Sequence, residues 1–188
     1  MRLRLAHRLL GALIALGVAT PLASGDDVVS GPPAGVRGAS LDAVHLLEEL
    51  VARSSTGRDL LEQLSRSDLV IFVRHAWFPI EMLRGRIGFL ASRSRGRLFA
   101  IEISSRQTRT EQLVALGHEL QHAVEIAGAA SVHDARTLAA FYTGIGELSG
   151  QPGSATCETA AAIATARRVR QELLAPSVSA DPALRRHH

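Results

Sequence analysis

The spacing of apolar residues predicts two consecutive helices after residue 40. Over 41–52 an apolar side chain recurs every three or four positions, which is the period of an amphipathic helix, and Ser40 is a suitable N-cap. A second, shorter helix is expected over 59–64, after a break at Thr56 and Gly57. The pattern therefore indicates two helices ahead of the first strand.

Three segments have the sequence character of β-strands. Residues 69–73 form a continuous run of β-branched and apolar side chains, which is typical of a buried strand. Residues 87–92 and 97–104 flank a short Arg-Ser-Arg-Gly segment, and side chains alternate in character along the second of them. We therefore expect a β-hairpin with its turn over 93–96, and three strands in all before residue 108.

The clearest helical pattern covers 108–127. Thr108 and Glu111 have the spacing of a capping box, and an apolar stripe at helical spacing follows them. Beyond it the sequence predicts, in order, a helix over 131–142, a glycine-rich loop over 144–153, a long alanine-rich helix over 156–174 and a disordered tail over 176–188. Residues 41–175 thus have the pattern of one α+β domain with a small antiparallel or mixed sheet of about three strands.

The first 40 residues have a different character. Residues 1–25 begin with a short basic stretch, continue with an apolar run and end in small residues, which is the order of a secretory signal peptide. The apolar run is shorter than the roughly 20 residues that a transmembrane helix needs. Residues 26–40 are rich in Gly and Pro and are interpreted as a flexible linker. We expect a secreted or periplasmic domain, with an uncleaved membrane anchor as the alternative.

Composition narrows the classes of function. The chain has 188 residues, of which 46% are hydrophobic and 21% charged, values typical of one globular domain. Its net charge of +3 comes from Arg2, Arg4 and Arg8, because the other 18 basic residues balance the 18 acidic ones. A nucleic-acid-binding surface is therefore not indicated. The single cysteine, Cys157, excludes an internal disulfide and a cysteine-based zinc finger.

The helix predicted over 108–127 carries the sequence His118-Glu119-Leu120-Gln121-His122, which has the form H-E-x-x-H. Residues four apart lie about 40° apart around a helix and one turn along it, so the two imidazoles can converge on one metal ion. Glu119 is turned about 100° from His118, which places it beside such an ion as a general base rather than as a ligand. The pattern predicts a zinc site, and two ordinary helix histidines are the alternative interpretation.

A zinc site of this kind needs a third protein ligand. Glu158 is the strongest candidate, because it stands at the start of the helix predicted over 156–174. The helix dipole favours a carboxylate there, and the small residues that follow allow close packing on the motif helix. Glu125, His133 and Glu147 are the other candidates, although Glu125 lies on the motif helix itself and suits a supporting role better.

The motif, the strands before it and a glutamate that opens a later helix resemble the gluzincin metallopeptidases, the thermolysin-like branch of the zincins, and small secreted bacterial zincin-like proteins. The resemblance covers roughly 69–174. It implies a minimal zincin-like fold, in which the sheet packs on the motif helix and on a following ligand helix. It also implies one zinc ion bound by His118, His122 and Glu158, with Glu119 as general base and a peptide or protein as substrate.

One feature of the gluzincins is missing from this chain. These enzymes commonly have an acidic residue four positions after the ligating glutamate, where it supports a histidine ligand. This chain has Ala162 at that position. The support would therefore come from elsewhere, with Glu125 and Asp134 as the candidates.

Enzymes of this family also stabilise the developing oxyanion with a tyrosine, histidine or arginine side chain. Tyr142 is the only tyrosine in the chain and falls between the ligand-bearing segments, so it is the first choice for that role. His133 and His75 are further options. The resemblance also implies an edge strand that pairs with a peptide substrate, and 87–92 is the segment we expect to provide it.

The sequence therefore predicts an extracytoplasmic zinc metallohydrolase, most simply a peptidase. A zinc-dependent structural or binding module without catalytic activity is one alternative. A helical interaction protein in which the motif is accidental is another. Metal content separates the last of these from the first two, and loss of activity in Glu119→Gln with zinc retained separates the enzyme from the structural module.

Overall fold

The computed structural model describes residues 35–79, 83–145, 147–149 and 156–175. Within them the chain forms, in order, β1 (Gly35–Gly38), α1 (Leu41–Arg53), α2 (Ser55–Ser65), β2 (Leu69–Ala76), β3 (Gly85–Arg93), β4 (Gly96–Ser104), α3 (Arg109–Ala127), α4 (Ala135–Ile145), β5 (Glu147–Ser149), β6 (Thr156–Glu158) and α5 (Ala160–Leu174). The segments expected as signal peptide (1–25) and tail (176–188), and most of the expected linker (26–40), lie outside the described residues. None of the described helices combines the length and the apolar content that a bilayer span requires.

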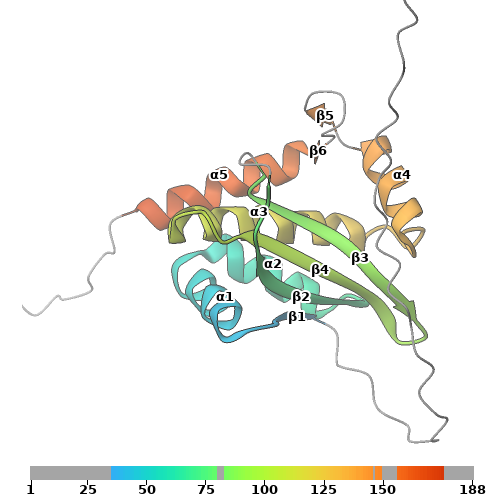
Figure 1. Ribbon diagram of the computed structural model, residues 1–188, viewed down its shortest axis with the longest axis horizontal. Coiled ribbons are helices and arrows are strands. Elements are labelled where there is room, and N and C mark those ends of the chain that lie inside the picture. The colour runs from blue at the N-terminus through green and yellow to red at the C-terminus, as the bar shows by residue number, and fades with distance from the viewer. Residues whose placement is uncertain (1–34, 80–82, 146, 150–155, 176–188) are drawn as a thin grey trace, which may run out of the picture. The chain divides into compact units, whose positions relative to one another are not determined.

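Four strands form one mixed sheet in the order β1, β2, β4, β3 (Figure 1). β1 and β4 run parallel to β2, whereas β3 is antiparallel to β4 and forms an edge of the sheet. The α+β class and the β3–β4 hairpin are confirmed, but the expected number of about three strands is wrong. The additional strand, β1, falls in the expected linker. Two of its four residues are glycine, so only its pairing with β2, and no local pattern, makes it a strand.

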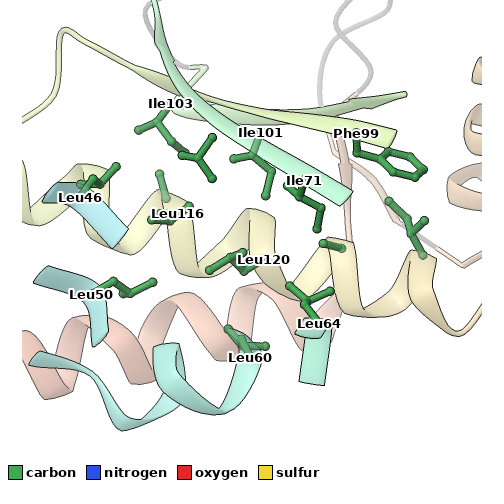
Figure 2. Close-up of a cluster of buried hydrophobic side chains, with 14 of the residues drawn as sticks. Leu46, Leu50, Leu60, Leu64, Ile71, Phe99, Ile101, Ile103, Leu116 and Leu120 are labelled. Atoms are coloured by element: carbon green, nitrogen blue, oxygen red, sulfur yellow. The ribbon is translucent and has the colours of Figure 1, made fainter. Parts of the chain in front are cut away.

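α3 is the central element of the core. It lies between the sheet on one side and α1, α2 and α5 on the other, and it is buried around most of its circumference (Figure 2). Phe99, Ile101 and Ile103 of β4 point towards it from the sheet, and each is fully buried. A helix buried around most of its circumference has little solvent-facing surface for its polar residues. The histidines and glutamates of α3 must therefore find partners inside the protein.

The helices over 41–52 and 108–127 are confirmed, with Ser40 and Thr108 as their N-caps. The break expected at Thr56 and Gly57 is wrong. Ser54 ends α1 and caps α2, accepting a hydrogen bond of 2.9 Å from the Gly57 amide, so that both residues lie inside α2. Gly57 is required there because a Cβ at this position would lie 2.6 Å from Leu50 Cγ.

The last two helices begin later than the sequence pattern predicts. α4 starts at Ala135 rather than at 131, and α5 starts at Ala160 rather than at 156. Residues 156–158 instead form β6, which pairs with β5 inside the segment expected as a loop. The local reason is Thr159, whose hydroxyl accepts a hydrogen bond from the Ala162 amide and so caps α5. Glu158 thus ends a strand directly before α5 instead of opening the helix.

The far end of α5 is fixed to the start of α2 by Glu172. Its carboxylate accepts hydrogen bonds from the hydroxyls of Ser54 (2.5 Å), Ser55 (2.7 Å) and Thr56 (2.8 Å), and from the Thr56 amide (3.2 Å). Partial burial alone would raise the pKa of Glu172, but these donors hold it below its usual range. The contact ties α5 to α2, and Glu158 lies two residues before the start of α5.

Candidate metal centre

Three side chains with metal-binding atoms meet at one place: His118 and His122 from α3, and Glu158 from the end of β6. One ligand atom of each lies within 4.8 Å of the other two. The two Nε2 atoms are 3.1 Å apart, and Nε2 of His118 is 3.2 Å from Oε2 of Glu158. Two nitrogen atoms bound tetrahedrally to one zinc ion are about 3.3 Å apart. Both the types of atom and their spacing therefore fit zinc, and we call these three candidate ligands the metal centre.

The metal centre is partly exposed among the described residues. The His122 side chain is 5% exposed, whereas those of His118 and Glu158 are 16% and 31% exposed. The two imidazole rings are 4.7 Å apart between centroids and nearly perpendicular. Residues four apart on α3 bring the rings together, and the turn from β6 into α5 brings the carboxylate to the same face of α3.

Electrostatics at the metal centre favour positive charge. Burial acts to lower the pKa of His118, but the carboxylates of Glu158 and Glu119 outweigh it and raise the pKa overall. The hydrogen bond with His118, in turn, lowers the pKa of Glu158. A group of side chains that stabilises a positive charge in this way suits a cation.

Glu119 lies beside the metal centre and is not one of its three converging ligands. The residue is 6% exposed, and burial raises its pKa to about 7, while the two histidines act in the opposite direction. β3 approaches it closely at Gly85, where a Cβ would lie 3.0 Å from Cγ and Oε1 of Glu119. The missing side chain at Gly85 therefore makes room for the carboxyl group that the sequence predicts to be the base. No sequence signal distinguishes this glycine from others.

A second carboxylate contacts the metal centre from the same helix. Oε2 of Glu125 is 2.9 Å from Nδ1 of His122, and Oε1 accepts a hydrogen bond of 2.6 Å from the hydroxyl of Thr159. Of the two supports expected from the sequence, Glu125 makes the contact. Asp134 instead binds Thr137 through its side chain near the start of α4. The spacing of Glu125 from His122 could be read from the sequence, whereas the contact with Thr159 depends on the tertiary fold.

Comparisons of the chain with protein-family models, with curated proteins and with solved structures found no match. Inference about function therefore starts from the metal centre and its surroundings.

Tyr142 packs directly on the metal centre. Its ring is 5.2 Å from that of His122 between centroids, with the planes nearly perpendicular. Its hydroxyl donates a hydrogen bond of 3.3 Å to the backbone oxygen of His122. In this arrangement the buried tyrosine orients the His122 side chain, and its role at an oxyanion stays a prediction.

The other sequence candidates fall in different places. His133 is exposed, with Nδ1 2.7 Å from the Ser131 carbonyl oxygen, and it lines a cavity of about 580 Å³ at the β3–β4 turn. His75 lines a separate cavity of about 420 Å³ between α1, β2 and α3. Glu147 is paired in register with Glu158 in the β5–β6 ladder. The segment 87–92 lies in β3, which is an edge strand as expected.

Proposed function

We propose that the protein is a zinc-dependent hydrolase that cleaves amide bonds in peptides or proteins. The observation that supports this most is the meeting of three ligand side chains from α3 and β6, with the buried carboxyl of Glu119 next to them. The H-E-x-x-H spacing alone is compatible with two unrelated histidines. A third ligand supplied by a distant segment of the chain is what distinguishes a catalytic type of zinc site from a histidine pair.

The residues of the chain divide the chemistry between them. A zinc ion held by His118, His122 and Glu158 would supply a Lewis acid that polarises a water molecule and the substrate carbonyl. Glu119 would accept a proton from the attacking water as the new C–O bond forms. It would then deliver that proton to the nitrogen of the leaving amine as the C–N bond breaks. Burial of Glu119 keeps bulk water from competing for the proton.

The position of β3 supports a peptide as the substrate. β3 is an edge strand of the described sheet, and its first residue, Gly85, is next to Glu119. An edge strand presents unpaired backbone groups with which an extended chain can form hydrogen bonds. A peptide bound alongside β3 would therefore lie close to Glu119. The signal-like pattern of residues 1–25 supports action outside the cytoplasm.

The proposal is tested by incubating the full-length chain with a mixture of internally quenched peptides. We expect hydrolysis that 1,10-phenanthroline abolishes and that added zinc restores, since removal of the metal removes the Lewis acid. Hydrolysis that continues unchanged in the chelator would contradict the proposal. A chain that binds zinc and cleaves none of the peptides would instead be the structural module.

Gly85→Ala is expected to lower kcat/KM by at least about 10-fold, because the added methyl group forces the Glu119 carboxyl to move. Gly88→Ala is the matched control: it lies in the same strand, and a Cβ there meets no atom within 4 Å. Rate measurements on both variants, with melting curves to show that each is folded, check the prediction. Equal rates for the two variants would show that β3 does not position the base.

A further inference from the structure

Both oxygens of the Glu125 carboxylate have partners, and the partners come from two different parts of the chain. Oε2 lies 2.9 Å from Nδ1 of His122, which is one turn earlier on α3. Oε1 accepts a hydrogen bond of 2.6 Å from the Thr159 hydroxyl. The Glu125 side chain is 14% exposed, so water competes little for these contacts. The carboxylate thus forms a bridge between α3 and the start of α5.

The contact with His122 determines which ring nitrogen faces the metal centre. A neutral imidazole has one N–H donor and one acceptor nitrogen. The carboxylate accepts a hydrogen bond from Nδ1–H, which leaves the lone pair of Nε2 directed at His118 and Glu158. Such a carboxylate also makes the imidazole a better metal ligand and restrains rotation of its ring.

The contact with Thr159 restrains the third ligand. Thr159 follows Glu158 directly in the chain. Its hydroxyl oxygen accepts a hydrogen bond of 3.1 Å from the Ala162 amide, which caps α5. The same hydroxyl donates a hydrogen bond to the Glu125 carboxylate. The backbone that carries Glu158 is therefore held to α3 through one hydroxyl and one carboxylate.

We propose that Glu125, acting through His122 and Thr159, is a positioning residue that sets the zinc affinity of the metal centre. This inference rests on the proposed function, because it presupposes that the three ligands bind zinc. It assigns to Glu125 no contact with the metal and no proton transfer. Its effect is to hold a histidine tautomer and the backbone of Glu158 in the arrangement that binds the ion.

The test compares zinc dissociation constants, measured against a chelator of known affinity, for the full-length chain and four variants. Glu125→Gln and Thr159→Val each remove one half of the bridge, and both are expected to weaken zinc binding by about 10- to 100-fold. Thr159→Ser keeps the hydroxyl and is expected to bind zinc like the parent. Glu111→Gln is the matched control, because this glutamate also lies on α3 but pairs with Arg84 and Arg170 rather than with a ligand.

A second measurement separates positioning from stability. Cobalt bound in place of zinc reports ligand geometry through its visible spectrum, and we expect an altered spectrum for Glu125→Gln and Thr159→Val but not for the other two variants. Metal-free melting temperatures would fall without a spectral change if the bridge were merely structural. A parent that binds zinc together with a Glu125→Gln variant of equal affinity and identical cobalt spectrum overturns this inference alone. A parent that binds no zinc overturns the proposed function, and the inference with it.

Discussion

The variant Glu119→Gln is expected to bind zinc like the parent but to hydrolyse peptides at least about 10²-fold more slowly. The substitution keeps the size of a buried side chain that lies next to Gly85, so packing around β3 changes little. It removes the group that would accept and return a proton. Because Glu119 is not one of the three converging ligands, the ion keeps its full set of protein donors.

The comparison with Glu111→Gln makes this result interpretable. Glu111 lies on the same helix and is also a carboxylate in contact with neighbouring side chains, but its partners are Arg84 and Arg170. Its loss is expected to leave the rate unchanged within a few-fold. Steady-state rates and zinc content of both variants decide the matter. Full activity in Glu119→Gln would remove Glu119 from the mechanism, and loss of zinc from it would make Glu119 a ligand.

Arg97→Met is expected to cost the metal-free protein at least about 3 kcal/mol of unfolding free energy. The Arg97 side chain is 7% exposed and forms two bonds of 2.7 Å with Asp68. It also donates to the carbonyl oxygens of Ile126 (3.2 Å), Ala129 (2.7 Å) and Val132 (3.0 Å). These carbonyls lie at and beyond the C-terminal end of α3, where backbone oxygens lack helical partners. Methionine fills the space but donates to none of these oxygens, and among the described residues only those of Ile126 and Ala129 keep a backbone amide donor, from Ala129 and Val132.

Urea unfolding of Arg97→Met and of Arg95→Met checks this prediction. Arg95 is exposed in the turn that precedes β4, so its replacement is expected to change stability by no more than about 0.5 kcal/mol. Asp68 is half-exposed and can be hydrated in the variant, so most of the expected loss comes from the hydrogen bonds that Arg97 donates to the three carbonyl oxygens. Equal unfolding midpoints for the two variants would show that the end of α3 does not depend on Arg97.

The parts of the fold that the sequence predicts correctly are those that depend on local patterns. The N-cap at Thr108, the buried run over 69–73 and the hairpin around 93–96 depend on neighbouring residues, and each appears in the structure. β1 could not be predicted in this way, because a strand of four residues with two glycines is defined by its partner β2. The predicted start of α5 is too early, because the alanine-rich stretch after Thr159 indicates a helix without locating its first residue, and the cap is Thr159.

The candidate site shows the same division. His118, Glu119 and His122 can be predicted from their spacing on one helix. Glu158 could be predicted as the third ligand because the chain is long enough to bring it back beside that helix. The bridge from Glu125 to Thr159 and the close approach of Gly85 to Glu119 depend on how α5 and β3 pack on α3. Contacts of that kind join residues far apart in sequence, so no periodicity or spacing along the chain encodes them.

The most direct test of the metal centre is the zinc content of the purified full-length chain and of His122→Ala and Glu158→Ala, measured by elemental analysis after dialysis against a weak chelator. We predict about one zinc ion per chain in the parent and substantial loss in both variants, since each removes one of three protein ligands. Retention of zinc in Glu158→Ala would assign the third position to another residue. A parent without zinc, even after incubation with the metal, would contradict the zinc hydrolase proposed for this protein.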